Sequence, residues 1–332
     1  MENIKKAKLI DLHAHVRLNS TDGAAGKYGP ETGEDENGMS WYRVGNYKLY
    51  GVKHKSSPFT DPKLRIEKMK KEKIDFQVLS PSPLTYFHFI ETKNAVSFCQ
   101  KHNDACSSLV KIYPDKLAGL ASLPMQDINE AIIELKRAVN SLGLLGAAIG
   151  TDFPINLDDN KLDKFYETLV DLNVPLFIHP APMGIDGPEG DLKLKRFDLD
   201  VVVGFASQET IAVSTLIFGG VLERHPNLDV WISHGGGGIP MLAARLAVAS
   251  RKRPWASATL KKDGKFEELI RRIWYDCHVT DLHALNLLKK WVDNNKIVYG
   301  TNFAGWDHSD NEYHFEPDPT WADNARKLLR MS

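Results

Sequence analysis

The amino-acid sequence predicts an α/β protein, a (β/α)₈ TIM barrel with a flap inserted after its first strand. Short apolar runs alternate with longer segments of helical periodicity along the chain of 332 residues. This alternation is typical of folds with a parallel sheet. The apolar runs number eight, which is the number of strands that closes such a barrel.

The expected strands are short, and several are apolar at consecutive positions, as in "VPLFIH" and "KIVYG". Such runs suit parallel strands that are buried on both faces. We expect strands at residues 8–13, 75–80, 117–122, 144–149, 174–179, 229–234, 273–277 and 297–300.

Segments with helical periodicity separate these runs. We expect helices at residues 61–72, 91–112, 127–143, 160–172, 208–224, 282–294 and 320–329. In the third of them, Asp127 is the expected N-cap and Gly143 the expected stop signal. A doubly wound open sheet is the alternative fold, but no glycine-rich dinucleotide loop follows the first strand.

Residues 17–60 interrupt the alternation. They are rich in glycine, polar and aromatic residues, and they are too many for an ordinary βα loop. Either they are disordered or they fold as a flap over the barrel mouth. Trp41, Tyr42, Tyr47 and Tyr50 favour the ordered flap. No linker or repeat divides the rest, so residues 1–332 are expected to form a single domain.

Composition narrows the range of partners and compartments. The formal net charge is -1, which gives no reason to expect nucleic acid or an anionic membrane surface as a partner. No apolar run reaches the length of a membrane span. The three cysteines are odd in number and lack metal-site spacing, so we expect a reduced, cytoplasmic setting.

Four histidines stand at the ends of expected strands. His13 and His15, in "LIDLHAHV", are two residues apart, so their side chains leave the strand on the same side. His179 ends the fifth strand, and His234 ends the sixth, before four glycines. Active sites of these barrels lie at the carboxyl ends of the strands. Solvated loop histidines are the alternative for an isolated pair, but four such positions indicate a divalent metal site.

The chain resembles a known family at this point. The stretches "IDLHAH", "FIHP", "SHGGG" and "YGTNF" are similar in order and spacing to those of the amidohydrolase superfamily. Within that superfamily the chain most resembles the decarboxylase branch, typified by aminocarboxymuconate-semialdehyde decarboxylase and the resorcylate and carboxyvanillate decarboxylases. The resemblance implies one divalent ion, zinc in the first place and manganese as the alternative. It also implies that His13, His15 and His179 are ligands and that His234 assists the chemistry beside the metal.

The resemblance suggests further substrate-binding residues. Arg245 matches an arginine that reaches the substrate carboxylate of a neighbouring subunit, which implies a homodimer. Lys53 falls where an arginine of the inserted loop binds the substrate, and Arg43 is a rival for that role. His278, in "YDCHVTD", is a further candidate. A surface charge, or an ordinary polar loop in the case of His278, remains the alternative for each.

One position departs from the family pattern. The family has an acid after the eighth strand that binds the metal and takes part in proton transfer, and here Asn302 stands there. An amide oxygen can coordinate a metal, but an amide exchanges no proton near neutral pH. Asn302 is thus an engineered replacement, a natural variant in which Asp307, His308 or His278 takes over, or the mark of a site without turnover. Asn302→Asp is predicted to restore activity by about 10²–10⁴-fold.

The combined features predict a metal-dependent decarboxylase acting on a small carboxylated aromatic compound or a ring-cleavage product. A metal-dependent hydrolase of a C–C, lactone or amide bond is the alternative, because both reactions use the same ligands. A metal-binding protein impaired by Asn302 is the third possibility.

Overall fold

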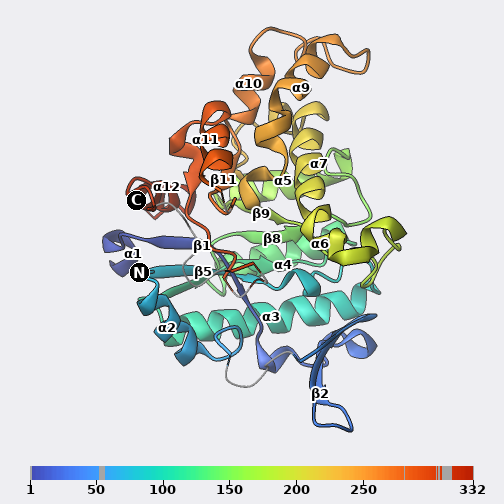
Figure 1. The fold of residues 1–332 in the computed structure, drawn as a ribbon, viewed down its shortest axis with the longest axis vertical. Coiled ribbons are helices and arrows are strands. Elements are labelled where there is room, and N and C mark those ends of the chain that lie inside the picture. Colours follow the sequence, from blue (N-terminus) through green and yellow to red (C-terminus); the bar gives the residue numbers. More distant parts are fainter. Residues whose placement is uncertain are drawn as a thin grey trace.

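The computed structural model describes residues 2–51, 57–279, 281–303, 305, 307–308 and 316–331. Eight short parallel strands surround the centre, and helices pack outside them (Figure 1). All eight lie where the sequence predicts strands, and the predicted α/β barrel is confirmed. They are β1 (Ile10–Val16), β5 (Phe76–Pro81), β6 (Leu117–Gly119) continued by β7 (Ala121–Ser122), β8 (Ala147–Gly150), β9 (Leu176–His179), β10 (Val230–Ile232), β11 (Trp274–Asp276) and β12 (Ile297–Val298).

Backbone hydrogen bonds connect the strands in two groups, β1-β5-β6 and β7-β8-β9-β10-β11-β12. On one side only Leu120 separates β6 from β7, and its amide donates to the Leu79 carbonyl at 2.9 Å. On the other side the Leu12 amide donates to the Tyr299 carbonyl at 3.0 Å, and the Phe303 amide donates to the His13 carbonyl at 3.0 Å. The first strand therefore lies between β5 and the chain that follows β12, which closes the ring.

The predicted helices are present with shifted ends. They are α2 (Pro62–Lys71), α3 (Thr92–Ile112), α4 (Ile128–Asn140), α5 (Asp163–Asp171), α7 (Gly204–Phe218) with α8 (Val221–Arg224), α11 (Leu282–Trp291) and α12 (Trp321–Leu328). Asp127 caps α4 by accepting from the Asn129 and Glu130 amides. Four further helices were not predicted from the sequence: α1 (Glu2–Lys6), α6 (Leu199–Val202), α9 (Ile239–Lys252) and α10 (Lys265–Ile270). Short 3-10 helices lie at Asn19–Thr21, Gly26–Tyr28, Pro83–Thr85, Asn160–Leu162, Leu192–Asp198, His234–Gly236 and Asn294–Lys296.

The interior of the ring is filled by side chains. One apolar cluster takes residues from every strand of the ring, among them Ile10, Phe76, Phe177, Trp231 and Trp274. The Phe177 and Trp231 rings stack with their centroids 3.9 Å apart. A packed interior leaves only the ends of the strands for ligand binding. The site must therefore lie above this cluster.

An irregularity in β1 decides where the first two histidines point. Ile10 and Leu12 both belong to the interior cluster, so strict alternation would turn His13 and His15 away from it. The pairing of β1 with β5 shifts register between Asp11 and Ala14. Such a bulge re-aims the residues that follow it. His13 consequently contacts the Phe177 ring, with the centroids 5.5 Å apart.

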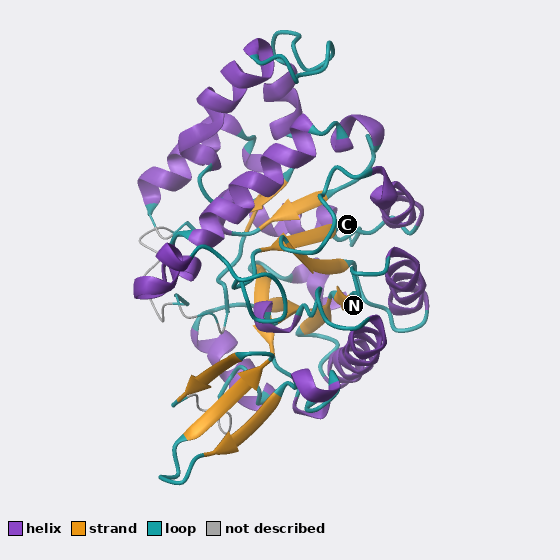
Figure 2. Ribbon diagram, turned by 90° about the vertical axis from the view of Figure 1, so that its right-hand side faces the viewer, coloured by secondary structure: helices purple, strands orange, loops and turns teal. Residues whose placement is uncertain are grey.

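The segment after β1 is folded. It forms a three-stranded antiparallel sheet of β2 (Glu31–Glu34), β3 (Ser40–Val44) and β4 (Tyr47–Tyr50), which stands apart from the barrel strands in Figure 2. Tyr42 and Val44 pack with Phe87 and Phe98 in a small separate core. The Arg17 amide donates to the Phe59 carbonyl at 3.0 Å and draws the two ends of the segment together.

No single helix within the described ranges is long and apolar enough to cross a membrane. One bent pair, Leu192–Val202 with Gly204–Phe218, passes that test only when its two members are taken together, across a bend of 80°.

Candidate metal centre

Three histidines from two strands converge above the interior cluster. His15 Nε2 lies 3.3 Å from His13 Nε2 and 3.3 Å from His179 Nε2, and the three possible ligand atoms lie within 4.8 Å of one another. Bonds of about 2.0–2.1 Å from a tetrahedral zinc ion place neighbouring nitrogen ligands roughly 3.3–3.4 Å apart. The spacing of these nitrogens therefore fits a single divalent ion.

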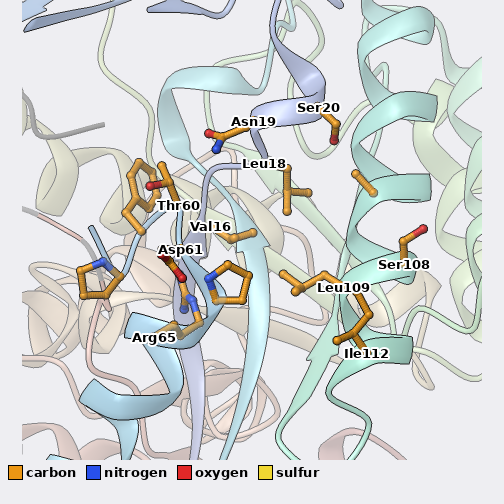
Figure 3. A pocket seen from close by; sticks show the side chains of 14 residues that line it. Val16, Leu18, Asn19, Ser20, Thr60, Asp61, Arg65, Ser108, Leu109 and Ile112 are labelled. Carbon is orange, nitrogen blue, oxygen red and sulfur yellow. The ribbon is translucent and has the colours of Figure 1, made fainter. Parts of the chain in front are cut away.

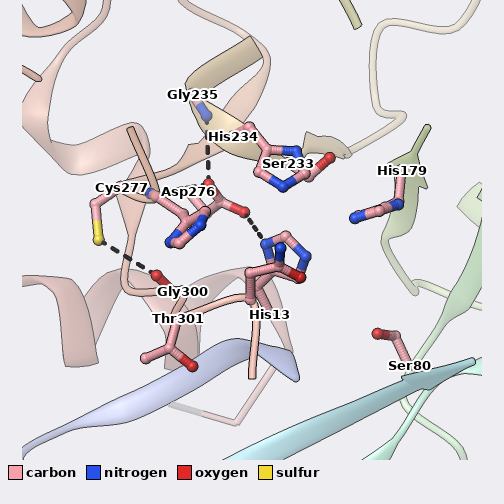
Figure 4. A network of polar contacts seen from close by, with 12 residues as sticks. His13, Ser80, His179, Ser233, His234, Gly235, Asp276, Cys277, Gly300 and Thr301 are labelled. Atoms are coloured by element: carbon pink, nitrogen blue, oxygen red, sulfur yellow. Dashed lines mark hydrogen bonds and ion pairs between the residues drawn. The ribbon is translucent and has the colours of Figure 1, made fainter. Parts of the chain in front are cut away.

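The outer nitrogen of each of the three rings is held by an oxygen acceptor. His13 Nδ1 donates to Asp276 Oδ2 at 2.8 Å (Figure 4), His15 Nδ1 to the Pro81 carbonyl at 3.1 Å, and His179 Nδ1 to the Pro180 carbonyl at 2.7 Å. Because these acceptors require the proton on Nδ1, the lone pair of each ring lies on Nε2, which faces the other two. This arrangement orients imidazoles for a metal.

The three imidazoles are neutral near pH 7. Burial lowers the pKa of His13 and of His179 well below the usual value, and the other nearby histidines lower both further. Burial also lowers the pKa of His15, to about 3. A metal therefore has no proton to displace from these nitrogens at neutral pH.

Asp276, on β11, was not identified from the sequence as a site residue. Its side chain is buried, and Oδ1 accepts from the Gly235 and His278 amides at 3.3 and 3.1 Å. A Cβ on Gly300 would come within 2.7 Å of His13 Cβ and 3.0 Å of Asp276 Cβ, so glycine is needed there. A lone acid inside the apolar run 273–277 was the signal that could have revealed Asp276.

His234 lies beside the three histidines, with its ring centroid 5.0 Å from that of His13 and 5.1 Å from that of His179. Its Nδ1 lies 2.7 Å from Glu209 Oε1, on α7. Burial alone would lower the pKa of His234, but the Glu209 carboxylate raises it to about 9. The Nδ1–H group of His234 is thus bonded to Glu209, and the Nε2–H group on the other side of the ring points away from Glu209. Glu209 is a lone acid in an apolar helix and was also missed.

Asn302 and His278 meet at Asp307. Asn302 Nδ2 donates to Asp307 Oδ1 at 2.5 Å, and His278 Nε2 donates to Asp307 Oδ2 at 2.9 Å. Asp307, His234 and His278 form a second group whose possible ligand atoms lie within 4.8 Å of one another. Asn302 Oδ1 is buried and has no hydrogen-bond partner among the described residues.

A pocket of about 600 Å³ opens beside the three histidines. His15, His179 and Asn302 line it, whereas His278 does not. The rest of its wall is mainly apolar and aromatic and includes three residues of the inserted sheet. The lining residues are His15, Tyr42, Tyr47, Leu49, Phe59, Ser82, Pro83, Leu84, His179, Pro182, Asp198, Val201, Val202, Phe205, Asn302 and Gly305.

The remaining predicted site residues lie elsewhere. Arg245 is exposed on α9, and Lys53 falls outside the described residues. Arg43 is occupied within the inserted sheet, where its guanidinium pairs with Glu31 at 2.8 Å. His308 does not line the pocket, and its two ring nitrogens contact the Glu72 carboxylate and the Thr301 carbonyl instead.

A second cavity, of about 460 Å³, lies between the chain after β1, the start of α2 and α3 (Figure 3). Leu18, Asp61, Arg65 and Leu109 line it, and none of the predicted site residues does. Among the described residues, its wall offers no cluster of metal-ligating side chains. The chemistry is therefore expected at the histidine pocket.

Comparisons with known proteins identify the family of this chain. An amidohydrolase family model matches residues 10–330. The 2-amino-3-carboxymuconate-6-semialdehyde decarboxylase of Dictyostelium discoideum is 33% identical over 244 residues, which cover 73% of this chain and 66% of that protein. The match thus spans just under two thirds of that relative.

Solved structures share the fold. The Metarhizium anisopliae IDCase superposes with a TM-score of 0.78 at 18% identity, covering 100% of this chain and 99% of that one. A dihydroxybenzoic acid decarboxylase from Polaromonas sp. JS666, with bound manganese and 2-nitroresorcinol, superposes with a TM-score of 0.74 at 20% identity, covering 97% of each chain. Because the family model matches residues 10–330, nearly the whole of this chain, the chain belongs to the amidohydrolase family.

Proposed function

We propose that this protein is a metal-dependent decarboxylase of small carboxylated aromatic compounds or ring-cleavage products. The observation that carries the proposal is the group His13, His15 and His179, whose Nε2 atoms converge beside an apolar pocket of about 600 Å³. The relatives named as decarboxylases support this reaction over others of the family.

The proposed ligands are the three histidines with Asn302 Oδ1 as a fourth. Asn302 Oδ1 suits this role because it is buried without a hydrogen-bond partner among the described residues. Three imidazole nitrogens and one neutral oxygen favour zinc, and manganese is the alternative because a solved relative holds it. We propose one ion per chain.

A divalent ion held here would polarise substrate oxygens next to the carboxylate that leaves. When CO₂ departs, the electron pair stays on the carbon that carried it, and that carbon must gain a proton. We propose that His234 supplies it, because its ring lies 5.1 Å from that of His179, which lines the pocket, and because Glu209 occupies Nδ1 and leaves the proton on Nε2. The pKa of about 9 keeps His234 protonated at neutral pH.

The pocket wall indicates the kind of substrate. Phe59, Phe205 and Leu49 provide flat or apolar surface for a ring, and Tyr47 and Ser82 provide hydroxyl groups for its substituents. Since Leu49 and Tyr47 belong to the inserted sheet, we propose that residues 17–60 act as a flap over the barrel mouth, within a single domain of residues 1–332. Lys53 and His278 remain proposed substrate-binding residues.

We propose that the working unit is a homodimer in which Arg245 reaches the neighbouring subunit's substrate. Arg245 is exposed on α9, and exposed apolar side chains lie on the same helix surface. Met241, Leu242 and Val248 are 78%, 37% and 46% exposed. A patch of this kind around a lone arginine is typical of a subunit interface.

We also propose a cytoplasmic location. Cys99, Cys106 and Cys277 are free and buried, and free thiols of this kind suit a reducing compartment.

Metal content and CO₂ release together test the function. Protein purified without chelator should contain about one zinc or manganese ion per chain and should release CO₂ from a panel of hydroxybenzoates, each product being identified by mass. His15→Ala should lose both. Hydrolysis products without CO₂ would favour the C–C, lactone or amide hydrolase alternative. Metal without any turnover would identify an impaired variant.

A further inference from the structure

The side chain of Asn302 is held in one orientation. Its Nδ2 donates to Asp307 Oδ1 at 2.5 Å. A carboxylate only accepts hydrogen bonds, so this contact decides which end of the amide faces Asp307. Oδ1 is consequently the end that remains, buried and without a hydrogen-bond partner among the described residues, in a side chain that lines the same pocket as His15 and His179.

The backbone turn at residues 302–305 favours this contact. Asn302 has a φ of 51°, in the left-handed region that asparagine tolerates better than most residues. The Gly305 amide donates to the Asn302 carbonyl at 2.7 Å, which folds the chain back. A Cβ on Gly305 would lie 2.5 Å from Asn302 Cγ, so the turn can close against the amide only with glycine at that position.

Asp307 is itself fixed from its other side. Its Oδ2 accepts from His278 Nε2 at 2.9 Å, and His278 is only 3% exposed. The carboxylate is therefore clamped between Asn302 and His278, and its negative charge stays one hydrogen bond away from residue 302. In a buried site, where screening by water is weak, a charge at that distance still acts on a cation.

We propose that Asn302 and Asp307 share the task of a single acid: Asn302 presents a neutral oxygen to the metal, and Asp307 supplies the negative charge through its hydrogen bond to the amide. Asp307 is thus a positioning residue that acts through Asn302. This inference rests on the proposed metal site. It reverses the expectation from the sequence that Asn302→Asp restores activity, since that change puts two carboxylates in direct contact.

The geometry disfavours a second metal at His234, His278 and Asp307. His278 and Asp307 are already bonded to each other, and His234 is paired with Glu209. This second group therefore satisfies itself by hydrogen bonds rather than presenting free ligand atoms.

A charge exchange between the two positions tests the inference. Zn²⁺ affinity by competition with a chelating dye, kcat and KM would be measured for Asp307→Asn, Asn302→Asp and the double variant Asn302→Asp/Asp307→Asn. Asp163→Asn is the matched control, because Asp163 also accepts from a histidine, His225, at 2.8 Å, and neither residue lines the histidine pocket.

We expect Asp307→Asn to weaken Zn²⁺ binding by about 10–100-fold, as the loss of a group that orients a ligand does. Asn302→Asp alone should lower kcat, and the double variant should regain the affinity of the unmodified chain to within a few-fold. That recovery could not come from a variant that fails to fold. Asp163→Asn should change nothing.

Two results would overturn the inference alone: unchanged Zn²⁺ affinity in Asp307→Asn, or a gain of activity in Asn302→Asp without the second change. An unmodified chain that binds no Zn²⁺, or binds it equally well with His15→Ala, would overturn the proposed function and this inference with it.

Discussion

Two groups of three side chains in this protein look alike by distance but differ in their hydrogen bonds and in their charge. His13, His15 and His179 have possible ligand atoms within 4.8 Å of one another, and so have His234, His278 and Asp307. In the first group every outer nitrogen is bonded to an acceptor outside the group, and the inner nitrogens face one another. In the second group His278 and Asp307 bond to each other, and His234 bonds to Glu209.

Charge separates the two groups as well. Burial lowers the pKa of His15 to about 3, whereas Glu209 raises that of His234 to about 9 against the effect of burial. The first group therefore offers neutral lone pairs, and the second offers a proton and a carboxylate. The hydrogen bonds behind the side chains, rather than the distances between them, therefore decide which group can hold a metal.

The largest change in metal content is expected when the first group loses a ligand and the second group is left intact. His15→Ala removes the nitrogen that lies 3.3 Å from both other ligand nitrogens. Metal content should therefore fall from about one ion per chain to background, and activity should be lost together with the metal. His278→Ala, in the second group, should keep its metal. Elemental analysis of both variants decides this, and equal metal loss in both would erase the distinction.

The next effect concerns the proton on His234. His234→Asn should keep the metal and lower kcat by about 10²–10⁴-fold, the usual cost of losing a general acid. In the unmodified protein, activity should fall as pH rises through the pKa of about 9, because the deprotonated ring has no proton to give. Glu209→Gln should move that fall to lower pH. A pH–rate profile that is identical in Glu209→Gln would refute the role of the pair.

A smaller effect is expected from the acceptor behind His13. Asp276→Asn exchanges the carboxylate at 2.8 Å for an amide and should weaken metal binding by about 10–100-fold. Ser80→Ala is the matched comparison, because His15 Nδ1 keeps the Pro81 carbonyl at 3.1 Å when the Ser80 hydroxyl is lost. Metal titration should show little change there. Equal losses in the two variants would argue against a special role for the carboxylate.

The smallest effect concerns Asp152, an acid outside both groups. Burial, and then Asp186, raise the pKa of Asp152 to about 7. The folded state therefore binds this proton more tightly than the unfolded chain, and stability falls as pH rises from about 4 to 7. Asp152→Asn stays neutral, so it should be more stable than the unmodified protein by about 1–3 kcal/mol at pH 8 and by less at pH 5. Urea unfolding at both pH values measures the difference.

The sequence was informative wherever the pattern is local. Eight apolar runs predicted eight strands. The positions of His13, His15 and His179 at strand ends predicted that they meet at the mouth of the barrel. Same-side spacing predicted that His13 and His15 point together. It could not predict the register shift between Asp11 and Ala14 that turns both inward, because that shift depends on the pairing with β5.

The residues that orient the histidines were harder to find. Asp276 is 263 positions from His13, and Glu209 is 25 positions from His234. Each is a lone acid in an otherwise apolar element, which is a visible signal, but its partner is defined only by the folded ring. The inserted sheet and α9 were missed or left open for a related reason. Their strands and faces are stabilised by packing against α3 and α7 rather than by a strong local pattern.

The closure of the ring has a consequence for how the protein folds. Ala14, between two of the proposed ligands, pairs with Phe303. The strand that carries His13 and His15 thus gains one neighbour only when segments some 290 residues apart meet, and contacts so distant in sequence form slowly. We expect the proposed ligands to take their final positions only when the ring closes, so tight metal binding should report on closure of the ring.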